Sequence, residues 1–205
     1  MATLTASKHV LIADLQGDRV RAAAGSMVAF EGTLEFKNSG LGAGGGMRAA
    51  LKRAVAGEGL SLMDCTGHGR AYLAIDAMDV LVTELAGNTL TVESEHILAL
   101  TDGLGLDVQF AGLRGMTSGQ GLATTTVTGH GQLALVSEGP VIALEVAPGS
   151  DVVVDPDCYV GSYGGLQMSL ISGISWKSLI GEGSGEPFSL RFAGSGTVYI
   201  QSSES

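Results

Sequence analysis

The sequence has 205 residues, 45% of them hydrophobic and only 16% charged, which is enough for one large domain or two small ones with a buried core. Its formal net charge is −10, and residues 71–205 hold 3 basic and 15 acidic side chains. This charge argues against general binding to nucleic-acid phosphates. No apolar run is long enough for a membrane-spanning helix, and two cysteines are too few for a disulfide framework.

The N-terminus, Met1-Ala-Thr-Leu-Thr-Ala-Ser, has no basic segment followed by an apolar one. It therefore predicts neither a secretory signal nor a transit peptide. With the low cysteine content, this predicts a cytoplasmic protein. A peripheral position at a membrane is compatible with the same features.

A glycine-rich segment at residues 40–45 formally matches the G-x-G-x-x-G pattern of dinucleotide-binding folds. The sequence after it does not alternate strands and helices as that fold requires. We therefore interpret the segment as a turn that enters a helix.

Residues 47–56 are the one predicted helix. The apolar side chains that recur every four residues are Met47, Leu51 and Val55. They would form one stripe that docks on the rest of the protein. The basic residues outside this stripe are Arg48, Lys52 and Arg53. They are a candidate binding surface for a protein partner or an anionic membrane, and an ordinary solvated helix face is the alternative.

An internal repeat of about 62 residues organises the whole chain. One anchor is the motif Gly57-Glu58-Gly59, which recurs as Gly119-Gln120-Gly121 and as Gly181-Glu182-Gly183. A second anchor is Thr66-Gly67-His68-Gly69, which recurs as Thr128-Gly129-His130-Gly131 and, three residues displaced, as Ala193-Gly194-Ser195-Gly196. The repeat predicts one compact body of three units, approximately 1–72, 73–134 and 135–201, around a pseudo-threefold axis, with a polar tail at 202–205.

Each unit has the pattern of β-strands. In Leu90-Thr91-Val92-Glu93 apolar and polar residues alternate, and residues 124–128 are rich in β-branched side chains. Turns are predicted at residues 86–88 and 147–149 and at the T-G-H-G segments. The predicted fold class is therefore all-β with one short helix.

Catalytic machinery is not evident in the sequence, so we predict no enzyme, no cofactor and no metal. His68 and His130 occupy equivalent positions, but two ligands without a third make a weak metal site, and we interpret them as turn residues. Glu58 and Glu182, with Gln120 between them, would have similar environments in a repeat, whereas catalytic carboxylates need different ones. The sequence contains no serine nucleophile elbow, His-paired cysteine motif or phosphate-binding loop.

The C-terminal segment Arg191-Phe-Ala-Gly-Ser-Gly-Thr-Val-Tyr-Ile-Gln201, together with the G-E-G motifs, resembles the altered-inheritance-of-mitochondria family, in the branch whose mitochondrial members are numbered twenty-four. The resemblance runs over nearly the whole chain. It implies a β fold similar to that of the trp RNA-binding attenuation protein, a short relative of the double-stranded β-helix. Bacterial members have no established enzymatic activity, and mitochondrial members are associated with inner-membrane organisation. The missing transit peptide indicates a bacterial member.

The leading functional expectation is therefore a non-enzymatic scaffold or interaction protein that forms a homo-oligomer. One alternative is a ligand- or RNA-binding oligomer like the trp RNA-binding attenuation protein, although fold does not transfer function. Another is a β-helix metalloenzyme, which would need a histidine cluster that the sequence does not spell out.

Overall fold

The computed structural model describes residues 1–39, 60–110, 123–172 and 188–202. These residues contain thirteen strands, two 3-10 turns and no α-helix, which confirms the predicted all-β class. The strands are β1 (Thr3–Ser7), β2 (Val10–Ala23), β3 (Met27–Ser39), β4 (Leu62–Leu73), β5 (Asp79–Ala86), β6 (Leu90–Glu93), β7 (Ile97–Thr101), β8 (Leu104–Phe110), β9 (Ala123–Ser137), β10 (Ile142–Val146), β11 (Val152–Val154), β12 (Tyr159–Ser172) and β13 (Phe188–Ile200). The 3-10 turns are η1 (Ser94–His96) and η2 (Pro156–Cys158).

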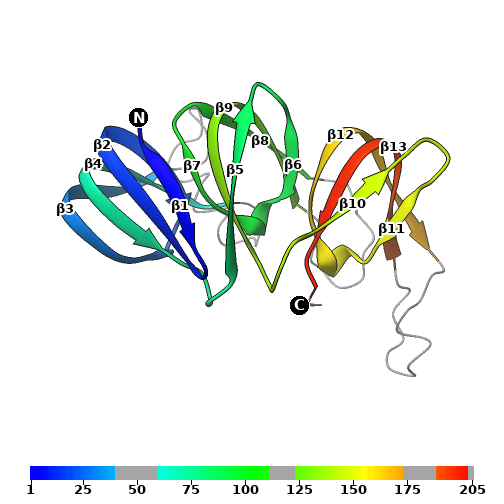
Figure 1. Cartoon of the computed structure of the whole chain (residues 1–205), viewed down its shortest axis with the longest axis horizontal. Helices are drawn as coiled ribbons and strands as arrows, with labels where there is room; N and C mark the ends of the chain where they lie inside the picture. Colours follow the sequence, from blue (N-terminus) through cyan, green and yellow to red (C-terminus); the bar gives the residue numbers. More distant parts are fainter. Residues whose placement is uncertain (40–59, 111–122, 173–187, 203–205) are drawn as a thin grey trace.

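The strands form one open antiparallel sheet in the order β10-β13-β12-β6-β9-β7-β2-β4-β3. Off this path β1 pairs with β2, β5 and β8 pair with β9, and β11 pairs with β13. Figure 1 shows the strands following one another along the long axis of the molecule. We refer to β1–β4, β5–β9 and β10–β13 as the first, second and third groups. None of the described helical segments is long and apolar enough to cross a membrane.

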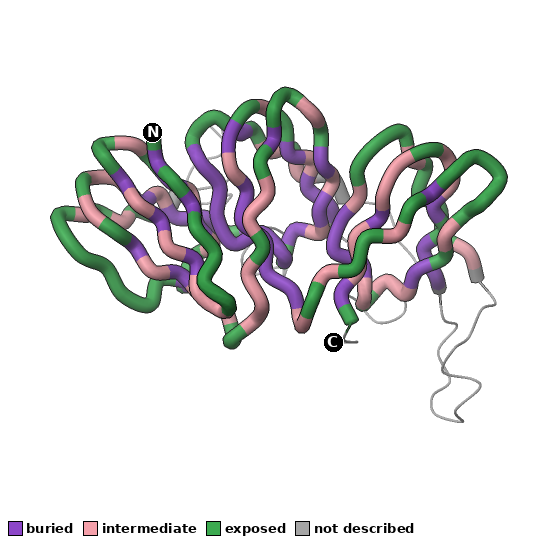
Figure 2. The backbone as a smooth tube through the Cα atoms, viewed as in Figure 1, coloured by how far each residue is buried: buried purple, intermediate pink, exposed green. Residues whose placement is uncertain are grey.

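Each group supplies most of one hydrophobic core cluster. β2 shows why, because its buried and more exposed residues alternate along most of its length and leave one face apolar. The first core centres on side chains such as Leu11 and Leu73, the second on Leu133, and the third on Phe192 stacked on Tyr159. Figure 2 shows the buried segments running through all three groups.

The T-G-H-G segments are not turns, and this part of the sequence prediction is wrong. They lie inside β4 and β9, and the corresponding A-G-S-G segment lies inside β13. A β-carbon built at Gly67 would lie 2.2 Å from the Thr33 carbonyl oxygen, and one at Gly129 would lie 2.3 Å from that of Gly103. The glycines are therefore required for close approach of the neighbouring strand rather than for chain reversal.

The predicted strand alternation and the turns predicted at residues 86–88 and 147–149 agree with the structure, whereas the predicted helix and the pseudo-threefold axis are not tested by it. Leu90 and Val92 are buried in β6 between half-buried neighbours, as the alternation predicts. Gly87 and Gly149 have positive φ where turns are predicted. The predicted helix at 47–56 lies outside the described residues. The pseudo-threefold axis stays a prediction.

Candidate functional site: the joints between groups

The first joint is a short ladder between β2 of the first group and β7 of the second. Val20, Arg21 and Ala22 pair with Thr101, Leu100 and Ala99, in that order. Leu98, which lies in the second group, is fully buried in the first core cluster. The first joint is therefore an apolar contact as well as a hydrogen-bonded one.

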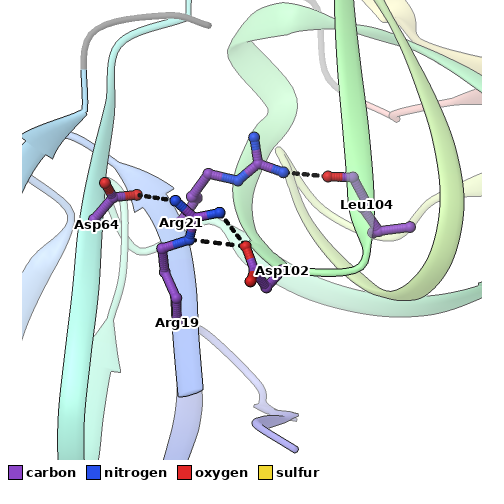
Figure 3. Close-up of polar contacts among 5 residues, drawn as sticks. All are labelled: Arg19, Arg21, Asp64, Asp102 and Leu104. Carbon is purple, nitrogen blue, oxygen red and sulfur yellow. Dashed lines mark hydrogen bonds and ion pairs between the residues drawn. The ribbon is translucent and has the colours of Figure 1, made fainter. Parts of the chain in front are cut away.

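Polar side chains from β2 reach across the edge of this joint (Figure 3). Arg19 Nε donates to Asp102 Oδ1 at 2.8 Å, and Arg21 Nη2 donates to the Leu104 carbonyl oxygen. The hydrogen bond that Arg19 donates to Asp102 raises the pKa of Arg19, whereas burial and the neighbouring Arg19 lower the pKa of Arg21. The side chains of Arg19 and Asp102 are about half exposed, so this ion pair contributes only about 0–1 kcal/mol.

The second joint has the same design. Leu90, Thr91 and Val92 of β6 pair with Tyr163, Ser162 and Gly161 of β12. Val160, at the start of β12, is fully buried in the second core cluster. A β-carbon built at Gly161 would lie 2.8 Å from the Thr91 carbonyl oxygen, so the two strands approach more closely here than a side chain allows.

A cluster of titratable side chains adjoins the second joint. One ligand atom each from Glu93, Glu95 and His96 lies within 4.8 Å of the others. His96 is buried, and its Nδ1–H donates to the Val136 carbonyl oxygen at 2.8 Å. This hydrogen bond leaves Nε2 on the side of Glu93, 3.7 Å from Oε2, which is too far for a hydrogen bond.

Burial favours the neutral forms of both Glu93 and His96. It raises the pKa of Glu93 to about 8, helped by the charges of Glu95 and Asp157. It also lowers the pKa of His96, although the Val136 carbonyl, Glu95 and Glu138 oppose this shift. Near neutral pH the pair is therefore mainly uncharged rather than a salt bridge.

Of the described residues, this cluster is the group whose atoms lie close enough to hold a metal ion. Glu93 ends β6 and precedes η1, which holds Glu95 and His96, and burial raises the pKa of Glu93 to about 8, so its carboxyl group is mainly protonated at neutral pH. We therefore assign the cluster a structural role, in which the protonation state of Glu93 affects the stability of the second joint.

An open groove lined mainly by apolar atoms lies among residues of all three groups. Its lining residues include the charged Lys8 and Asp79 and the largely apolar Leu81, Pro140 and Tyr199. Lys8, Asp79 and Ser137 are polar, and most of the other described residues that line the groove are apolar. It therefore gives little support to the ligand-binding alternative.

Comparison with known proteins identifies the family. A family model described as mitochondrial biogenesis AIM24 matches residues 3–203. The chain belongs to the AIM24 family. This confirms the resemblance found in the sequence, and the description of the family names no chemical reaction.

A crystal structure of a protein from Streptococcus pyogenes is similar to this AIM24-family chain, with a TM-score of 0.75. The match covers 100% of this chain and 94% of that one at 22% sequence identity, which shows a shared fold. No curated protein matches the chain significantly.

Most of the site residues predicted from the sequence lie outside the described parts of this AIM24-family chain. They are Arg48, Lys52, Arg53, Gly57, Glu58, Gly59, Gly119, Gln120, Gly121, Gly181, Glu182 and Gly183. His68 and His130 are described, but they are strand residues in β4 and β9 and not turn residues. Each lies against a positive-φ glycine of its own group, Gly17 and Gly87 respectively. Neither belongs to a group of three metal-ligating residues among those described.

Sequence reasoning missed the joints and the cluster beside the second one. The available signal was Glu93-Ser-Glu-His96, which is matched 62 residues later by Asp155-Pro-Asp-Cys158. Both segments form the 3-10 turns η1 and η2, and both place acidic residues at the same two positions. A search of the repeat for recurring acids would therefore have found this region.

Proposed function

We propose that this AIM24-family chain is a non-enzymatic scaffold built from three copies of one β unit, with a fold similar to that of the trp RNA-binding attenuation protein. The observation that carries the proposal is the exposure of apolar side chains on the terminal strand β3. Val28 is 64% exposed and Phe30 47% exposed. Among the described strands only β4 pairs with β3, and exposed apolar residues on a strand edge without a described partner are typical of an interaction surface.

A register shift that recurs in one strand of each group supports the three-unit architecture. β3, β7 and β12 each carry a register shift at the same place, between Met27 and Ala29, between Ile97 and Ala99, and between Tyr159 and Gly161. Bulges at equivalent positions are designed features of a strand rather than accidents. Superposition of the three groups in an experimental structure would test this part of the proposal.

We further propose that the scaffold works in the cytoplasm at an anionic membrane surface, which it binds through Arg48, Lys52 and Arg53. Each basic side chain near anionic lipid contributes roughly 1 kcal/mol, so three contribute roughly 3 kcal/mol. Neither Cys65 nor Cys158 takes part in a disulfide, which is compatible with a reducing compartment.

Liposome co-sedimentation tests the membrane proposal. The full chain is compared with a variant in which Arg48, Lys52 and Arg53 become Gln, on vesicles of phosphatidylglycerol and phosphatidylcholine. A control variant in which Lys8, Lys37 and Arg70 become Gln removes the same charge elsewhere. We expect the first variant to bind on the order of 100-fold more weakly and the control to stay within a few fold.

Equal binding by the two variants would contradict the membrane proposal. The RNA-binding alternative makes a different prediction in the same experiment. Stronger binding to single-stranded RNA than to vesicles at physiological salt would favour it, although the net charge of −10 opposes such binding.

A further inference from the structure

The two joints inside the chain use equivalent positions of successive groups. Val20 of the first joint opposes Cys65 of β4, and Leu90 of the second joint opposes Val127 of β9. Cys65 and Val127 are 62 residues apart, which is the length of the repeat. Both joints therefore attach the same part of one group to the same part of the next.

At each joint one bulged residue fills the core of the preceding group. The residue is Leu98 in β7 and Val160 in β12, and each lies at the register shift of its strand. Leu98 is buried in the first core cluster and Val160 in the second, and both are 0% exposed. We call the residue at this position the plug residue.

The first group has a plug residue without a core to fill. The equivalent register shift in β3 falls at Val28, which is 64% exposed. Met27 and Phe30, on either side, are also exposed. Among the described strands only β4 pairs with β3, so the outer edge of β3 lacks a described partner.

The third group has a strand, β11, whose edge without a described partner could complete a joint of the same kind. β11 lies 62 residues after the joint segment of β6, pairs with β13 on one edge, and has no described strand on the other. Its Val153 is 38% exposed. The described part of the third core holds 6 buried residues, against 15 in the first core and 12 in the second. A core that lacks a plug residue from a following group is expected to be smaller.

We propose that β3 of one copy docks on β11 of a second copy of this chain, in the geometry of the two internal joints. The register of the internal joints pairs Val153 with Phe30 and inserts Val28 into the third core of the neighbouring copy. Antiparallel addition of a strand satisfies both open edges and buries the exposed apolar side chains. This inference rests on the three-unit architecture proposed above.

Such a contact is heterologous, because it uses a different surface on each copy. Each added copy leaves one β3 and one β11 free, so copies add head to tail. The assembly closes into a ring if the rotation at each joint permits and otherwise extends as a filament. Either outcome would present many copies of the same surface to a partner.

Sedimentation velocity over a range of concentrations tests the inference on the full chain. The variants are Val28→Asp, Val153→Asp and, as a matched control, Met168→Asp. Met168 is also an exposed apolar strand residue, on β12 outside both joint segments. We expect the wild type to associate, each joint variant to associate at least tenfold more weakly, and the control to stay within twofold of the wild type.

Three results would overturn the inference: a wild type that is monomeric at every concentration, equal weakening by the control, or weakening by Val28→Asp alone. The last result would indicate a symmetric contact between two β3 strands. Urea unfolding of each variant at low concentration checks that it folds, and Val28→Ser serves as a milder replacement if Val28→Asp does not. A monomeric wild type would leave the liposome experiment, and with it the proposed membrane scaffold, untouched.

Discussion

Val28 and Leu98 lie at the register shifts of β3 and β7, but Val28 is exposed and Leu98 is buried. Both are bulged residues opposite a central strand, in β3 and β7 respectively. Leu98 is fully buried because the first group lies in front of it, whereas Val28 is 64% exposed because no described group precedes it. The difference shows that burial at this position depends on a neighbouring group rather than on the strand itself. An exposed apolar residue on the end strand of a sheet can therefore mark an unused copy of an internal interface.

Replacing each plug residue by alanine, in separate variants, gives the largest expected difference between the two positions. We expect Leu98→Ala to lower the free energy of unfolding by about 2–5 kcal/mol, because it leaves a cavity between two groups. Val28→Ala should change it by less than about 0.5 kcal/mol in dilute solution, where copies are separate. Urea unfolding at low protein concentration measures both changes. Similar losses for the two variants would contradict the equivalence of the positions.

The second joint can be tested by adding one methyl group. A β-carbon at Gly161 would lie 2.8 Å from the Thr91 carbonyl oxygen, so we expect Gly161→Ala to destabilise the protein by roughly 1–3 kcal/mol. Gly165, on the same strand, is the control, because its β-carbon would lie 3.8 Å from the nearest backbone atom. Thermal or urea unfolding compares the two. An equal effect at both glycines would show that close approach at the joint is unimportant.

The cluster beside the second joint predicts that the stability of the protein depends on pH. The folded-state pKa of Glu93 is about 8, above its ordinary value of 4.5, so the folded state holds a proton that the unfolded state has lost. Stability from this group is therefore fully present below about pH 4.5 and is lost as the pH rises to about 8. The lowered pKa of His96 acts oppositely, since it reduces stability as the pH falls below 6.5.

Between pH 6.5 and 8 the Glu93 effect should dominate. We expect the wild type to lose about 2 kcal/mol of unfolding free energy over this window, at about 1.4 kcal/mol per pH unit. Glu93→Gln keeps the shape of the side chain without the charge and should flatten the profile. Unfolding free energies at several pH values measure the slopes. A variant as steep as the wild type would show that another group causes the dependence.

The ion pair at the edge of the first joint should give the smallest effect. Arg19 and Asp102 are exposed enough that water and salt screen them, so we expect Arg19→Gln to cost about 0.2–1 kcal/mol at low salt and less at high salt. Arg70→Gln, which removes an exposed pair with Asp14 inside the first group, is the matched control. A loss above 2 kcal/mol for Arg19→Gln alone would show that polar contacts rather than the plug residue dominate the first joint.

The sequence predicted the strands better than the contacts between them. Alternation in β6 predicted its buried and half-buried residues correctly, because period two depends only on local geometry. The T-G-H-G segments were misread as turns, since their glycines serve a tertiary contact that no local pattern reveals. Glu93 and His96 were missed for a similar reason. Acidic residues are usually exposed, whereas the side chain of Glu93 is only 14% exposed.

Mixing two variants that each block one strand tests the proposed contact between β3 of one copy and β11 of another most directly. Val28→Asp blocks β3 but leaves β11 intact, and Val153→Asp does the reverse. We predict that each variant alone is monomeric in native mass spectrometry and that an equimolar mixture forms a complex of one copy of each, with no larger species. A mixture that stays monomeric, or that grows beyond two copies, would contradict a head-to-tail joint between β3 and β11.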